Sequence, residues 1–225
     1  MKSYEKPDIA EWAEDDPRRQ MTGFDREFLR EQYNEWMPPE QPALESLPGL
    51  TVAEEMLAEE AKRVGGYALD IGCGNAKLIV TLASRGYISS GFGIDISDAM
   101  IEAARQTALN IGVDVGFLRT PFESFSCGKV DIVIAAEVLE HIYAPRLMVA
   151  RARNMLVAGG SFIGKTPLEH TCDAIVHLHY FTTQSLVALL SPFFTSVSVK
   201  PVDVTGEGEY RLVFICRNPR EVLSE

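Results

Sequence analysis

Residues 68–77 read Ala-Leu-Asp-Ile-Gly-Cys-Gly-Asn-Ala-Lys, and this stretch decides how the rest of the chain is interpreted. A short apolar run, Tyr67–Ile71, leads into two glycines one residue apart, which let the backbone turn tightly and approach a ligand closely. Asp70 places a carboxylate beside that turn, a charge that suits an ammonium group better than a pyrophosphate. A dinucleotide fingerprint would carry its third glycine at position 77, which is Lys77. The stretch therefore predicts a strand, a ligand-binding turn and a helix.

The segments on either side alternate between strand and helix patterns. Apolar and β-branched runs predict seven strands, at 67–71, 91–94, 115–118, 130–136, 161–164, 193–199 and 210–216. Helices are predicted from a capping box at Thr51 to about Val64, and at 76–84, after Ser97 to about 110, at 137–157 and at 183–190. This alternation predicts an α/β fold, doubly wound around a mostly parallel seven-stranded sheet. In such sheets, ligands bind beyond the carboxyl ends of the strands.

Composition divides the 225 residues into two parts. The first 65 residues hold 16 of the 32 acidic side chains against 8 basic ones, and the first 50 hold six prolines. We predict an acidic, helical or irregular N-terminal extension over 1–50 and a ligand-binding domain over 51–225. The aromatic residues of the extension, including Tyr33 and Trp36, prompt the hypothesis that it folds over the site as a lid.

The net charge of −11 argues against a broad basic face for nucleic acid. Four widely spaced cysteines form no C-x-x-C pair, which indicates reduced thiols in a cytoplasmic protein. No apolar run is long enough to span a membrane, and the chain does not start with a secretory signal. The oligomeric state is not predicted.

A second acid, Asp95, follows the predicted strand 91–94. A carboxylate there can accept hydrogen bonds from both hydroxyls of a ribose. Nicotinamide enzymes use the same spacing, so the spacing leaves a nicotinamide-dependent oxidoreductase open, although Asp70 and Lys77 argue against it. A non-catalytic cofactor-binding or interaction protein is a further alternative.

The D-x-G-x-G pattern at 70–74 resembles motif I of the class I S-adenosylmethionine-dependent methyltransferases. E-V-L-E-H at 137–141 resembles their motif IV in enzymes that act on small molecules, and H-L-H-Y-F-T at 177–182 resembles the segment before their next helix. The resemblance covers about residues 52–217. It implies a Rossmann-like methyltransferase fold, S-adenosylmethionine as cofactor, S-adenosylhomocysteine as product, and methylation of an oxygen or nitrogen nucleophile on a small-molecule acceptor by in-line displacement.

The resemblance also implies contacts with the cofactor. Asp70 would face the methionine amino group, the glycine turn would pass along the methionine and the sugar, and Asp95 would bind the ribose. An acid that binds adenine in many members falls on Arg119, which cannot accept a hydrogen bond, so adenine is assigned to the backbone of Thr120 and to packing. The predicted cofactor-binding residues are Asp70, Gly72, Cys73, Gly74, Asp95, Ile96, Met100, Thr120, Pro121, Phe122 and Glu137.

A cluster of acidic residues and histidines follows the fourth strand. On a helix, Glu137, Glu140 and His141 would lie on one face at the mouth of the crevice. Three roles remain open for them together with His179: a histidine as general base, a site for Mg²⁺, Mn²⁺ or Zn²⁺, or a structural lining of the pocket. Ubiquinone-pathway O-methyltransferases and small-RNA terminal methyltransferases, which the motif resembles, carry such a metal site. We predict His141 and His179 as catalytic and no metal.

Overall fold

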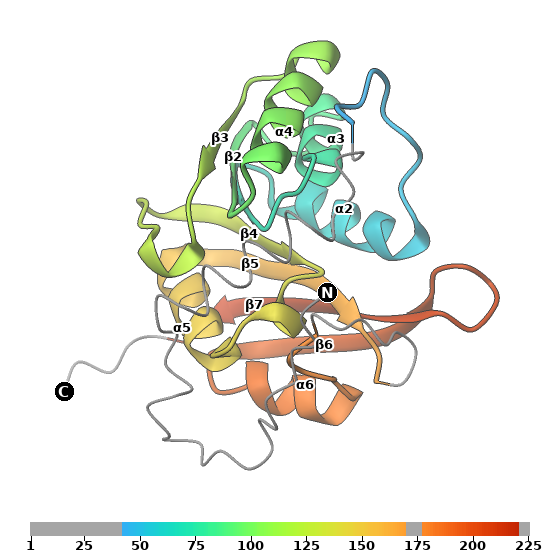
Figure 1. The fold of residues 1–225 in the computed structure, drawn as a ribbon. Helices are drawn as coiled ribbons and strands as arrows, with labels where there is room; N and C mark the ends of the chain where they lie inside the picture. Colours follow the sequence, from blue (N-terminus) through green and yellow to red (C-terminus); the bar gives the residue numbers. More distant parts are fainter. Residues whose placement is uncertain (1–41, 170–176, 221–225) are drawn as a thin grey trace, which may run out of the picture.

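A computed structural model of the protein describes residues 42–169 and 177–220 (Figure 1). Most of the predicted extension, including Tyr33 and Trp36, lies outside the described residues. The part that is described contacts the domain, because the Leu44 N–H donates to Thr107 Oγ1 at 2.9 Å.

The described residues form one seven-stranded sheet with the strand order β3-β2-β1-β4-β5-β7-β6. Neighbouring strands pair in parallel from β3 to β5, whereas β7 runs antiparallel to both β5 and β6. The prediction of an α/β fold around a mostly parallel sheet is confirmed. The strands are β1 (Tyr67–Ile71), β2 (Ser90–Asp95), β3 (Val115–Arg119), β4 (Val130–Ala136), β5 (Leu156–Pro167), β6 (Phe194–Asp203) and β7 (Tyr210–Pro219).

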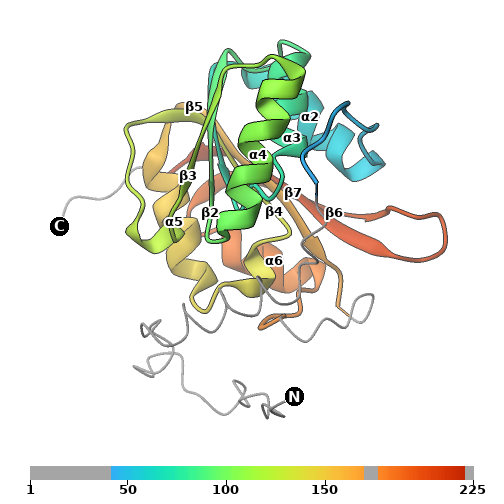
Figure 2. The ribbon, with the colours of Figure 1, turned by 45° about the horizontal axis from the view of Figure 1, so that its top comes forward.

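Helices cover both faces of the sheet (Figures 1 and 2). One buried cluster joins Leu57, Ile79 and Ile101 to the sheet, and a second joins Met148 and Leu186 to its other face. None of the helices described combines the length and the apolar character that a membrane span requires. The helices on the first face are α2 (Val52–Val64), α3 (Lys77–Ser84) and α4 (Asp98–Ile111), and those on the second are α5 (Pro145–Met155) and α6 (Thr183–Leu190).

Local sequence signals account for most of these boundaries. Thr51 and Glu54 form the predicted capping box at the start of α2, and Gly65 ends that helix with its N–H donating to Ala61 O. The Ser97 side chain accepts a hydrogen bond from Met100 N–H at the start of α4. The helix predicted at 76–84 begins at Lys77, because Ala76 adopts a left-handed conformation.

The prediction that residues from about 137 to 157 are mostly helical is wrong for the first part of that stretch. Glu137 has φ +58°, and its N–H donates to Lys165 O at 2.7 Å, so the chain is still held to β5 where the helix was expected. A short 3₁₀ turn, Leu139–His141, follows, and α5 begins only at Pro145, whose missing N–H suits a first helical position. Strand β5 also begins at Leu156, earlier than predicted, with an irregularity before Ser161.

Candidate active site

A cavity of about 420 Å³ opens at the carboxyl ends of the parallel strands. This size is typical of a small-molecule site. The cavity lies beside β1 and β4, where the strand order reverses and ligands of doubly wound sheets bind. Its lining consists of Glu54, Asp70, Ile71, Gly72, Cys73, Gly74, Asn75, Lys77, Leu78, Ile94, Asp95, Ile96, Met100, Thr120, Pro121, Phe122, Glu123, Ala136, Glu137, Val138, His141, Ile142 and Lys165.

The glycine turn lines the cavity. The N–H groups of Gly72 and Cys73 both donate to Ile94 O, at 2.8 and 3.0 Å, which ties the turn to β2. Gly72 has φ +67°, and a Cβ added there would lie 2.7 Å from Val138 Cγ2. Position 72 therefore requires glycine both for its conformation and for the space it leaves.

Asp95 holds the other end of the turn. Its Oδ2 accepts from Gly74 N–H at 3.0 Å and its Oδ1 accepts from Ser97 N–H at 2.9 Å. Burial raises the pKa of Asp95, and these backbone hydrogen bonds oppose the rise. A carboxylate offers about four lone-pair positions, so Asp95 can accept further hydrogen bonds from a ligand in the cavity.

Asp70 is fully buried at the end of β1 and lines the same cavity. Burial, with the nearby Asp95 as a second cause, raises the pKa of Asp70 to about 8. The carboxyl group is therefore largely neutral at pH 7. A cation bound beside Asp70 would stabilise the negative charge and so favour the ionised carboxylate.

The side of the cavity next to β3 is apolar. Met100 and Phe122 are buried, and Ile96 and Pro121 complete this wall. Flat apolar surfaces of this kind suit an aromatic ring. Each of the four was predicted from the sequence as a cofactor-binding residue, and each lies in the cavity lining.

Arg119 lies outside the cavity lining. Its Nε is 3.1 Å from Asp98 Oδ1 and donates to Ile96 O at 3.3 Å. The N–H of the next residue, Thr120, donates to Asp95 O at 2.9 Å. The backbone contribution predicted for Thr120 is therefore limited to its carbonyl, because the amide group is already used within the fold.

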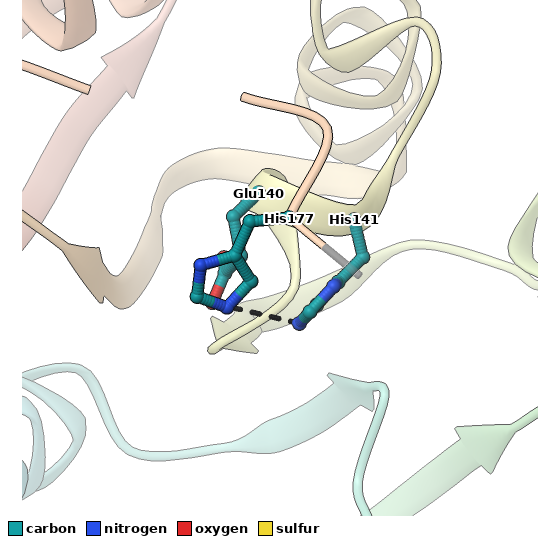
Figure 3. A group of neighbouring side chains, drawn as sticks. All are labelled: Glu140, His141 and His177. Carbon is teal, nitrogen blue, oxygen red and sulfur yellow. Dashed lines mark ion pairs between the residues drawn. The ribbon is translucent and has the colours of Figure 1, made fainter. Parts of the chain in front are cut away.

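Glu140, His141 and His177 come together (Figure 3), and His141 also lines the cavity. One candidate ligand atom from each residue lies within 4.8 Å of the other two. Glu140 Oε2 accepts from Thr166 Oγ1 at 2.9 Å, whereas Glu140 Oε1 is buried, has no hydrogen-bond partner among the described residues and lies 3.8 Å from His141 Nε2. Burial, reinforced by Glu137, raises the pKa of Glu140 to about 8.

This cluster differs from the predicted one. Glu137 turns its carboxylate to Arg211, with Nε donating to Oε1 at 2.9 Å, and His179 Nε2 lies 2.8 Å from Ile142 O. His179 is not among the cavity-lining residues, and His177 lies beside His141 instead, with ring centroids 5.0 Å apart. The H-x-H pattern in the sequence includes both His177 and His179, but nothing in it indicates which of the two lies beside His141.

The sequence patterns did not predict the charged residues of the cavity wall. Glu54, on the first turn of α2, accepts from Lys77 Nζ at 2.8 Å and lies 3.4 Å from Lys165 Nζ. Burial opposes ionisation of Glu54, but the Lys77 hydrogen bond and the backbone of Thr51 hold its pKa below its ordinary value. The capping-box pattern revealed the helical role of Glu54, but no local pattern places it beside β5.

Comparison with known proteins agrees with this architecture. Residues 69–164 match a family model described as a methyltransferase domain. A ubiquinone biosynthesis O-methyltransferase of Saccharophagus degradans is 35% identical over 101 residues, which cover 44% of this chain and 42% of that protein. The chain therefore matches less than half of the length of this curated relative.

Two solved structures share the fold at low sequence identity. The 1,6-didemethyltoxoflavin-N1-methyltransferase of Burkholderia thailandensis, with bound 1,6-didemethyltoxoflavin and S-adenosylhomocysteine, has a TM-score of 0.67 at 18% identity, covering 87% of each chain. The N-methyltransferase NodS of Bradyrhizobium japonicum, with S-adenosylhomocysteine, has a TM-score of 0.60 at 21% identity, covering 76% of this chain and 89% of NodS. Together with the methyltransferase domain matched over residues 69–164, these likenesses show that the chain has the Rossmann-like fold of the class I S-adenosylmethionine-dependent methyltransferases.

Proposed function

We propose that the protein transfers a methyl group from S-adenosylmethionine to an oxygen or nitrogen nucleophile of a small-molecule acceptor. The observation that carries this proposal is the single cavity lining that joins the Gly72–Gly74 turn to Asp70 and Asp95. When bound, S-adenosylmethionine supplies a methyl group on a positively charged sulfur, which is already a good electrophile. The chain then has to bind the two reactants, align the nucleophile with the methyl group and exclude water from the site.

Different cavity residues would bind different parts of the cofactor. Asp70 offers a carboxyl group for the methionine ammonium, and Asp95 keeps acceptor capacity for the ribose hydroxyls after its two backbone hydrogen bonds. Met100 and Phe122 offer buried apolar surface for adenine. This assignment uses both acids and the apolar wall, and it leaves the side of the cavity at His141 for the acceptor.

We propose His141 as the general base that removes the acceptor proton. It lines the cavity, and its Nε2 lies 3.8 Å from Glu140 Oε1, so the imidazolium formed would favour the ionised form of Glu140 and be stabilised by it. An imidazole is suited to this task near neutral pH. His141→Ala should lower kcat by about a hundredfold or more with little change in S-adenosylhomocysteine affinity. A variant with unchanged kcat would refute the role.

A second candidate for the same residues is a divalent metal site formed by Glu140, His141 and His177. The observation that favours it is the approach of one carboxylate oxygen and two imidazole nitrogens within 4.8 Å of one another. Such donors suit Zn²⁺ or Mn²⁺. Elemental analysis of protein purified without chelator decides between the candidates, since a general base needs no stoichiometric metal and keeps its turnover in chelator.

The cofactor proposal is tested by thermal unfolding with S-adenosylmethionine, S-adenosylhomocysteine and NADH in parallel. A ligand at about 100 times its Kd should stabilise the fold by roughly 2.7 kcal/mol. We expect the two sulfur ligands to raise Tm and NADH to leave it unchanged, and a shift with NADH alone would refute the proposal. The curated relative is named an O-methyltransferase, so hydroxyl compounds are the first acceptors to test.

A further inference from the structure

A row of alternating charges runs from α2 along the cavity wall and continues beyond it to β7. Lys77 Nζ lies 2.8 Å from Glu54 Oε2, and on the far side Arg211 Nε lies 2.9 Å from Glu137 Oε1. Lys165 stands between these two pairs on β5. Lys77 and Arg211 each have a carboxylate at close hydrogen-bond distance.

Lys165 is held much less closely. Its Nζ lies 3.4 Å from Glu54 Oε1 and 3.5 Å from Glu137 Oε1, whereas charge-assisted hydrogen bonds to carboxylates are typically about 2.7–2.9 Å. An ammonium group carries three N–H donors, and the Lys165 side chain is only 13% exposed. A nearly buried ammonium with loose partners, lining a cavity, has donor capacity for an anionic ligand group.

The sheet places Lys165 on the same side as Asp70. Asp70 pairs with Ile134 on β4, and Ala136, two residues further along β4, pairs with Lys165 on β5. Alternate residues of a strand share a face, so Asp70 and Lys165 project to one face of the sheet, with β4 between them. The cavity thus has an acid on one side of β4 and an ammonium on the other.

This pair of opposite charges complements an α-amino acid group, which carries an ammonium and a carboxylate on one carbon. We propose that Lys165 binds the carboxylate of the methionine part of S-adenosylmethionine while Asp70 receives its ammonium, an assignment that rests on the proposed function. Lys77 is already engaged by Glu54 at 2.8 Å. Arg211 is engaged by Glu137 and Glu209 and is not among the cavity-lining residues.

Isothermal titration of two ligands tests this assignment. S-adenosylhomocysteine carries the amino acid group, and 5′-methylthioadenosine keeps the sulfur and the nucleoside without it. Lys165→Met keeps a long side chain but removes the charge, and we expect it to weaken S-adenosylhomocysteine at least tenfold while the affinity for methylthioadenosine stays within twofold. Lys165→Arg should retain most of the affinity. Lys200→Met, the same change at an exposed residue of β6, is the matched control.

The outcomes separate this assignment from the proposed function. If Lys165→Met weakens both ligands equally, or neither, Lys165 does not recognise the carboxylate and the assignment is overturned. If the wild-type protein binds neither ligand, the proposed function itself fails. Thermal unfolding of each variant is measured first, and Lys165→Gln, which fills the position without charge, replaces the methionine variant should that one not fold. The same selective loss is expected of it.

Discussion

At position 72, the energetic cost of the left-handed backbone conformation can be measured separately from the cost of a steric clash. Gly72 and Gly86 share φ +67°, but an added Cβ meets Val138 Cγ2 at 2.7 Å at position 72 and nothing within 4 Å at position 86. Gly86→Ala should therefore cost only the left-handed strain, about 1–2 kcal/mol in the free energy of unfolding. Gly72→Ala should cost at least about 1 kcal/mol more and weaken S-adenosylhomocysteine more than tenfold.

Denaturant unfolding and calorimetric titration measure these two effects. The double variant Gly72→Ala with Val138→Ala relieves the contact and should recover part of the lost stability. Equal losses for the two single alanine variants would mean that the space beside Val138 is not limiting.

Asp70 should make stability depend on pH. Its pKa is raised to about 8, above its value of about 3.8 in the unfolded chain. The folded protein therefore holds this proton more tightly than the unfolded chain does. The stability that this difference contributes is complete below pH 4 and is lost as pH rises toward 8. Between these limits, each such group lowers the free energy of unfolding by about 1.4 kcal/mol per pH unit. Asp70→Asn should remove that slope, and the variant should be more stable than the wild type at pH 8.

Glu140 is the internal comparison for this prediction. Its pKa is also raised to about 8, so the Asp70→Asn variant should keep the pH slope that Glu140 contributes. Urea unfolding at pH 5, 6, 7 and 8 gives the slopes directly. An unchanged slope in the variant would mean that Asp70 is ionised in the folded protein without ligand. The variant should also bind S-adenosylhomocysteine more weakly, because the ammonium loses its carboxylate.

At the scale of elements, Glu60 fastens α2 to the sheet. It is 3% exposed and accepts hydrogen bonds from Arg217 on β7, from Arg63 on its own helix and from Ser161 on β5. Burial opposes ionisation, but these bonds lower the pKa of Glu60 to about 2. Its contribution to stability is therefore complete above about pH 4.5 and is lost as pH falls toward 2.

Glu60→Gln should destabilise the fold by about 2–4 kcal/mol at pH 7, because two arginines lose their carboxylate. Glu59→Gln changes the neighbouring exposed residue of the same helix and should stay within about 0.5 kcal/mol of the wild type. Urea midpoints at pH 7 compare the two variants. If both variants behave alike, α2 is held by its apolar face alone.

Some helices and strands were predicted accurately from the sequence, and others were not. Strand β4 and helix α6 were predicted with their observed bounds, because β-branched residues mark the strand and Pro192 follows the end of the helix. The segment after β4 was predicted wrongly as helix. Its backbone is held by a hydrogen bond from Glu137 N–H to Lys165 O, 28 residues away, and no local propensity reports such a bond.

At the scale of the whole molecule, the buried residues of both hydrophobic clusters lie within the predicted domain 51–225, and Leu47 and Leu50 pack against one of the clusters. These buried residues run from Ala53 to Cys216. We therefore expect residues 42–225 to fold without the first 41, with a cooperative thermal transition within a few degrees of that of the full chain. Leu44 is kept because it contacts α4. Loss of the cooperative transition would mean that the domain extends further toward the N-terminus.

The same truncated chain tests the hypothesis of a lid. If the N-terminal extension covers the site, truncation should raise the KM for the acceptor or the Kd for S-adenosylhomocysteine several-fold. Full affinity for both would refute the hypothesis. Binding is measured on the same preparation whose thermal transition has been recorded, so that loss of folding and loss of a lid are told apart.

Local sequence patterns were enough to predict the α/β class, the glycine turn and the two acids at the ends of β1 and β2. These features follow from local rules: the period of apolar residues, the conformations that glycine allows, and the position directly after a strand. Tertiary structure alone decided that His177 rather than His179 joins His141, that Glu137 turns to Arg211, and that Lys165 lies between two carboxylates. The partners in these contacts lie 28 to 111 residues apart, and only the pairing and layering of the elements brings such side chains together.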